Sequence, residues 1–322
     1  MMETAMQADS VTRPRRATRE TTNRQPATIA TVMLWELRCY MARRSSWLML
    51  AVVFGFFVFL MWFMRSIALV TFFVPEPASV AVSGTSAWGM VRTLPRVMVL
   101  AFGMFLPFLA AGGVARDLKQ RTHEIVMSTP VPTRSYVWGR YLAVLAVGLC
   151  MALLMLLAIF LTGYALHLGT DYPPPNMAAI LSLWATVVLP AMVLITSVCF
   201  VLGTLLPRFS NPVKVVVLTA WFLSIYLAIP PNVPTWYPAW DPTSRAMSYE
   251  LELQYKPQSE PDLIFQYPKD SAALEQMRQT VRNKEQVIPD LVPWVPPKLA
   301  YIGLGFLLVA LVSLRFQRFR NV

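Results

Sequence analysis

Apolar residues run in long stretches along the chain, and shorter polar segments separate these stretches. A bilayer core of about 30 Å needs about 20 consecutive, mostly apolar residues in helical form. Six stretches come near this length: roughly Trp47–Met64, Val97–Ala115, Tyr141–Gly163, Ile180–Leu206, Val213–Pro231 and Leu299–Leu314. The pattern predicts an all-α membrane protein with six transmembrane helices.

Two of these stretches deviate from a simple span. The fourth is the longest, and Pro190 in its middle removes one backbone hydrogen bond, so we expect the helix to loosen there. The sixth is short, and the sequence LVPWVPP before it suits the membrane interface.

The polar segments complete the domain organisation. The first residues are Arg-, Ser- and Thr-rich with no apolar core of a signal peptide, which is typical of a disordered tail. The next segment spaces Ile29, Val32, Met33, Leu37 and Tyr40 as on one helix face and predicts an amphipathic interface helix; a plain basic flank of the first span fits equally. The expected divisions are a basic tail at 1–28, the interface helix at 29–46, spans one to five at 47–231, an outer cap at 232–298, and the sixth span with a basic tail at 299–322.

Charge sets the orientation of the predicted spans. The side that holds both termini carries 18 Lys and Arg and a net charge of +12, against 10 and −1 on the other side. Basic residues stay on the cytoplasmic side of a membrane. Both termini are therefore predicted to be cytoplasmic, in the cell (inner) membrane, and anionic lipid accounts for the basic chain without a nucleic-acid partner.

Composition agrees with this class. Apolar residues make up 56% of the chain, charged residues 14%, and the mean hydropathy is +0.50, whereas soluble domains carry about 25% charged residues. The three cysteines, Cys39, Cys150 and Cys199, are far apart and are expected to be buried thiols rather than disulfides or metal ligands.

The outer segment 232–298 is predicted to form a small cap. Leu274, Met277, Val281 and Ile288 make an apolar stripe there. The stripe packs on the cap's own loops or binds an extracytoplasmic partner, and both alternatives stay open.

The sequence contains no motif that indicates an enzyme. The predicted spans hold almost no ionisable residues, and the chain lacks zinc-protease, nucleophile-elbow and phosphate-loop motifs. We expect no catalytic residue, no metal site and no cofactor in this chain, and no ATP hydrolysis by it alone. A lumen without charges favours a lipid-linked, amphipathic or peptide cargo over a small ion.

A charged stretch at 115–140 interrupts the apolar pattern on the cytoplasmic side. Residues 116–127 contain good helix formers and no Pro or Gly, and Pro130 stops the helix. Leu118, Ile125 and Val126 share one face. From spacing alone, this short amphipathic helix is either a lever between two spans or an ordinary loop that fixes topology.

This stretch resembles the segment between the second and third spans in permeases of type-2 ATP-binding cassette (ABC-2) exporters. The similar positions are Asp117, Thr122 and Glu124, then the run 128–131 that ends Pro130–Val131, then Gly139–Arg140. Arg121 stands where the family has Gly, which favours continuous helix. The sequence LWELRCYMARR, with Glu36 and Arg38, resembles the family's cytoplasmic helix before the first span.

The resemblance implies a coupling helix that contacts a separate ABC ATPase. Lys119, Arg121 and Glu124 would meet the ATPase, and Leu118, Ile125 and Val126 would hold the helix on the membrane. Two ATPase copies, which bind the ATP and Mg²⁺, would drive a homo- or heterodimer of permease chains. The small residues at 110–113 would let helices pack closely in lipid.

A non-transporting membrane anchor that scaffolds an extracytoplasmic partner through 232–298 is the alternative function. A membrane enzyme is the third, and the missing motifs disfavour it.

Overall fold

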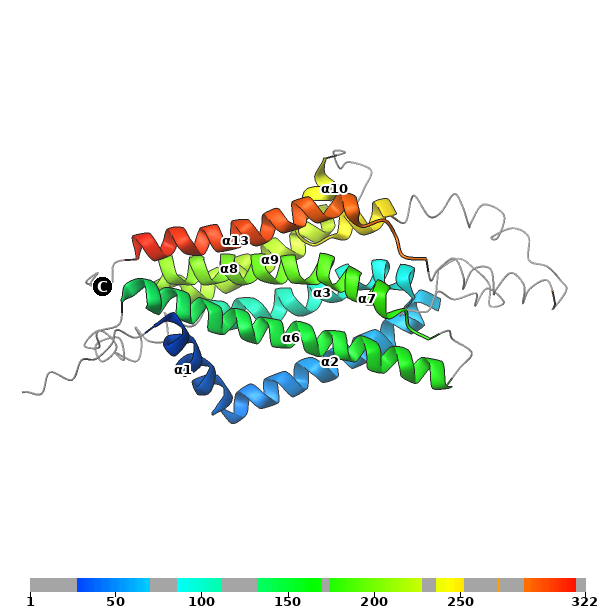
Figure 1. The fold of residues 1–322 in the computed structure, drawn as a ribbon, viewed down its shortest axis with the longest axis horizontal. Coiled ribbons are helices and arrows are strands. Elements are labelled where there is room, and N and C mark those ends of the chain that lie inside the picture. The colour runs from blue at the N-terminus through cyan, green and yellow to red at the C-terminus, as the bar shows by residue number, and fades with distance from the viewer. Residues whose placement is uncertain are drawn as a thin grey trace, which may run out of the picture.

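A computed structural model describes residues 28–69, 86–111, 132–169, 174–227, 236–251, 272 and 287–316. Every regular element within these ranges is a helix, and the long helices lie side by side in one elongated bundle (Figure 1). The predicted all-α class is confirmed for this part of the chain.

The bundle consists of long helices joined by short helical turns. A short helix, α1 (Ile29–Met41), leads into it. The long elements are α2 (Arg44–Leu69), α3 (Ala87–Ala110), α6 (Thr133–Gly169), α7 (Met177–Leu183) with α8 (Leu189–Leu205), α9 (Ser210–Leu227) and α13 (Val295–Arg315). The short elements are the π-helical turn η2 (Trp184–Val188), the 3-10 turns η3 (Pro207–Phe209) and η4 (Val292–Trp294), and α10 (Tyr237–Trp240).

Four helical segments of the described chain are long and apolar enough to cross a membrane: Arg44–Phe63, Thr133–Gly169, Met177–Leu205 and Val292–Arg315. They correspond to predicted spans one, three, four and six. The predicted second and fifth spans fall on α3 and α9, which lie in the same bundle, and α3 contributes the shorter apolar segment Ala101–Ala110. The chain is thus a multi-pass membrane protein; the six-span topology stays a prediction.

The helix bounds correct two features of the sequence analysis. The third and sixth spans were expected from Tyr141 and Leu299, whereas α6 begins at Thr133 and α13 at Val295. Pro296 and Pro297 are compatible with this start because the first helical turn needs no N–H donors from its residues. Arg140 and Lys298 therefore lie inside helices of the bundle, and both are buried. The expectation of spans nearly free of ionisable residues was wrong at these two positions.

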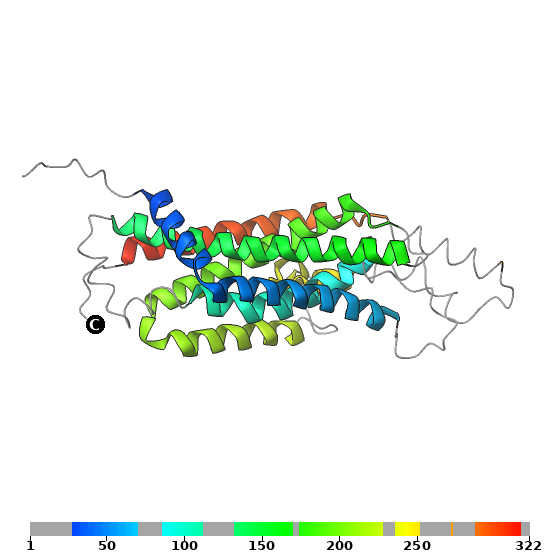
Figure 2. The ribbon, with the colours of Figure 1, turned by 90° about the horizontal axis from the view of Figure 1, so that it is seen from below.

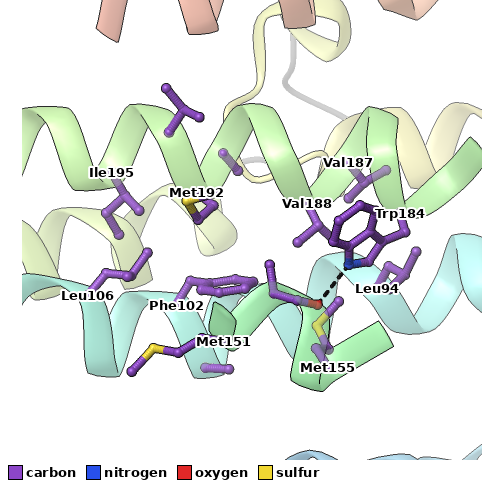
Figure 3. Packing of buried hydrophobic residues seen from close by; sticks show 14 of the residues in the cluster. Leu94, Phe102, Leu106, Met151, Met155, Trp184, Val187, Val188, Met192 and Ile195 are labelled. Carbon is purple, nitrogen blue, oxygen red and sulfur yellow. Dashed lines mark hydrogen bonds between the residues drawn. The ribbon is translucent and has the colours of Figure 1, made fainter. Parts of the chain in front are cut away.

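The core lies where α3, α6 and the η2–α8 segment meet (Figure 3). Trp184 of η2 donates from Nε1 to the carbonyl oxygen of Ala152 in α6, at 3.0 Å and away from solvent. The surrounding buried side chains are Leu94, Phe102, Leu106, Met151, Met155, Val187, Val188, Met192 and Ile195. Side-chain packing of this kind holds helices together in lipid, where little hydrophobic drive exists.

Proline loosens the fourth span as the sequence predicts. Pro190 lies two residues after η2, where the helix widens into a π turn. Such turns interrupt the regular hydrogen-bond ladder without ending the helix.

Small residues bring α3 and α8 into close contact. A Cβ atom on Gly203 would lie 2.7 Å from both the Cα and the carbonyl oxygen of Ala111. Ala110 and Ala111 are both buried. The predicted role of the small-residue stretch 110–113 is confirmed for Ala111; Gly112 and Gly113 lie outside the described residues.

Candidate functional site: the joint between α1 and α6

The first helix lies across the start of α6 at one end of the bundle (Figures 1 and 2). Thr28 caps it, since its side chain accepts a hydrogen bond from the Thr31 amide. The helix ends at Met41, so residues 44–46 of the expected interface helix belong to α2 instead. We call this end of the bundle, which also holds the start of α6 and the end of α13, the α1 end.

A buried ion pair joins the two helices. Arg140 Nε lies 2.7 Å from Glu36 Oε1, and both side chains are almost fully buried. The guanidinium carbon of Arg140 also lies 4.7 Å from the centre of the Tyr136 ring. Buried charges in an apolar environment need such partners, and removal of one partner is strongly destabilising.

Gly139 makes this pairing sterically feasible. A Cβ atom at Gly139 would lie 2.6 Å from Val32 Cβ and 3.0 Å from the carbonyl oxygen of Ile29. No side chain fits there, so α1 rests directly on the backbone of α6. Gly139 thus permits the close contact between the helices, and Arg140 neutralises the charge of Glu36.

Arg38 has a different position. Its side chain is exposed, and its carbonyl oxygen accepts the amide of Ala42 at the end of α1. The structure therefore brings Glu36 into the joint and leaves Arg38 on the outer face. The exposed Leu34 and Trp35 give that face an apolar character suited to a membrane interface.

The predicted coupling residues lie outside the described part of the chain. They are Asp117, Leu118, Lys119, Arg121, Thr122, Glu124, Ile125, Val126 and Pro130. The two helices that flank them are described: α3 ends at Ala110, and α6 begins at Thr133, where Tyr136 N donates to Pro132 O.

A second polar cluster lies at the opposite end, which we call the α10 end. The carboxylate of Asp241 accepts the amide and hydroxyl of Thr243 at 2.9 and 2.7 Å, and the amide of Ala246 at 2.8 Å. Lys298 Nζ donates to the backbone carbonyl of Asp241 at 2.7 Å. Burial, assisted by the charge of Asp241, raises the pKa of Tyr237.

Sequence reasoning missed this cluster. Lys298 was assigned to the outer cap, yet it lies in the first turns of α13 and is only 2% exposed. The one available signal was a lysine directly beside an apolar stretch, in the sequence VPPKLAY.

Part of the chain, including part of this site, matches a known protein family. Residues 89–240 match the family described as ABC-2 family transporter protein, a region from α3 to α10 that includes Arg140. Glu36 and Lys298 lie outside the matched region. A search of curated proteins finds no match. The match covers somewhat less than half of the chain, and it supports an ABC-2 type permease, the membrane component of an ABC transporter.

Proposed function

We propose that the chain is the permease subunit of an ATP-driven exporter and that a separate ABC ATPase drives it through the α1 end. The observation that carries this proposal is the buried Glu36–Arg140 pair, which ties α1 to the beginning of α6. Two permease chains and two ATPases, which bind ATP and Mg²⁺, make up the proposed assembly. The α1 end faces the cytoplasm in this arrangement.

The joint gives the ATPase a mechanical route into the bundle. A push on segment 115–130 reaches α3 and α6, because these helices flank it. The ion pair and the close contact at Gly139 make α1 follow the same displacement. The helix α6 contains 37 residues without an internal proline, so it spans about 55 Å. A movement at its start therefore reaches the α10 end without an intervening hinge.

Charge reversal in the coupling segment tests the proposal. The tagged full chain is purified from its host in mild detergent, and the ATPase activity of the complex is measured. We expect an ABC ATPase to co-purify, and we expect Glu124→Arg and Lys119→Glu to lose it or to abolish its stimulation. Asp290→Arg is the control, because Asp290 is exposed and lies at the α10 end. This variant should retain full stimulation of the ATPase activity.

Two results count against this function. The first is a complex without an ABC ATPase, above all one in which only an extracytoplasmic protein co-purifies, since that result supports the scaffold alternative and assigns the function to 232–298. The second is stimulation that both charge reversals leave unchanged.

A further inference from the structure

The segment 236–251 packs against the side of a membrane-spanning helix. Its Trp240 and Asp241 contact Tyr301 and Lys298 of α13. Lys298 lies six positions inside the candidate span that begins at Val292, roughly 9 Å along the helix axis. Figure 1 accordingly shows α10 beside α13, short of the end of that helix. The segment thus belongs to the bundle itself.

Charged and polar groups attach the segment to α13. Lys298 Nζ donates to the carbonyl oxygen of Asp241, and the Tyr301 hydroxyl donates to that of Trp240. The Trp240 and Tyr301 rings meet edge to face with centroids 6.2 Å apart. Both Asp241 and Lys298 are buried. Separation from α13 would leave the buried amino group of Lys298 without its acceptor in an apolar environment, which is costly.

A neutral hydrogen bond attaches the same segment to α3. Pro95 has no N–H, so the carbonyl oxygen of Val91 lacks its partner within the helix. Ser248 Oγ donates to this oxygen at 2.8 Å, in a buried position. Release of this bond leaves no charge behind, and charge-assisted bonds are roughly twice as strong as neutral ones.

The two attachments bridge two different helices, α3 and α13, which both pack against α8. We propose that the segment 236–251 is the outer latch of the transport path. It travels with α13 through Lys298, and it releases from α3 at Ser248 when the α10 end opens. This inference rests on the proposed function, since an export cycle supplies the opening step.

Spin-label distances in the purified full chain test the attachments without ATP. The three native cysteines are replaced, and a label at Tyr249→Cys is paired with Met104→Cys on α3 or Leu311→Cys on α13. All three positions are exposed. Ser248→Ala should broaden only the distance distribution to α3, whereas Lys298→Met should broaden both distributions. Ser313→Ala, which removes a hydroxyl-to-carbonyl bond within α13, should change neither.

A second measurement follows the latch in the complex with its ATPase, trapped with ATP and vanadate. We expect the distance from position 249 to position 104 to lengthen beyond the width of its resting distribution, while the distance to position 311 stays unchanged. The latch is refuted if the distance to position 311 changes instead, or if neither distance changes in the trapped complex. It is equally refuted if Lys298→Met leaves both resting distributions narrow.

The two measurements separate the inference from the proposed function. If no ABC ATPase joins the chain, the proposed function fails, and the opening step fails with it. The distances in the isolated chain still show which helix holds the segment.

Discussion

Glu36 of α1 and Arg140 of α6 form an ion pair of 2.7 Å in a site from which solvent is almost excluded. The pair fixes α1 to the helix that follows the predicted coupling segment. Two features of this joint can be tested separately: the charge pair itself and the close contact between α1 and α6 at Gly139.

The ion pair should make a large contribution to stability. Arg140→Met leaves the Glu36 carboxylate buried without its cation, so we expect the free energy of unfolding to fall by about 3–5 kcal/mol. The double variant Glu36→Met/Arg140→Met should recover most of this loss, because no charge then remains buried. Denaturant unfolding in detergent measures each value. Arg38→Met, an exposed change on the same helix, should stay within about 0.5 kcal/mol of the parent.

The contact at Gly139 should tolerate no side chain. Gly139→Leu places atoms where Val32 lies, and overpacking of this kind costs about 1–3 kcal/mol. Val32→Ala in the same chain should restore part of the loss. Gly55→Leu, in α2 with nothing within 4 Å of the added Cβ, is the matched control. Equal thermal shifts for the two glycine variants would contradict a close contact between α1 and α6.

The contact between α8 and α3 should also be destabilised by an added side chain. Gly203→Ala brings a methyl group to 2.7 Å from backbone atoms of Ala111, and backbone yields less readily than a side chain. We expect a loss of about 1–3 kcal/mol, measured as a lower melting temperature of the purified chain. Gly303→Ala on α13 meets open space and should leave the melting temperature unchanged.

The bond from Trp184 to α6 should stabilise the π turn. Trp184→Phe keeps most of the ring and removes the donor to the Ala152 carbonyl, at a cost of about 0.5–1.5 kcal/mol. Hydrogen exchange over 184–188 should become faster than in the parent chain. Trp35→Phe, at a half-exposed position of α1, provides the comparison. Unchanged exchange in η2 would show that the indole bond does not hold the turn.

Hydropathy was sufficient to predict the long helices but not where they begin. The predicted third and sixth spans each started one residue after a charge, at Tyr141 and Leu299. The structure continues both helices past those charges, because Glu36 and Asp241 supply partners for Arg140 and Lys298. Pattern analysis cannot find such partners, since Asp241 and Lys298 are 57 positions apart and share no periodicity.

The candidate site was predictable to the extent that its residues belong to local motifs. Glu36 and the Gly139–Arg140 pair were singled out from the sequence, yet only the fold shows that they meet. The residues proposed for contact with the ATPase, such as Lys119 and Glu124, stay predictions because they lie outside the described chain.

The π turn η2 also has a consequence for how the fourth span can vary. It accommodates one residue more than regular helix would, so loss of one residue from Trp184–Val188 would restore an ordinary α-helix. Each residue turns a regular helix by about 100°, but the π turn already absorbs the turn that its extra residue would add. Such a deletion would therefore leave the facing of α7 relative to α8 unchanged, and Ile180 and Leu183, now buried, would stay in the core. The fourth span can thus lose one residue at this turn without changing the surface that it presents at the α10 end.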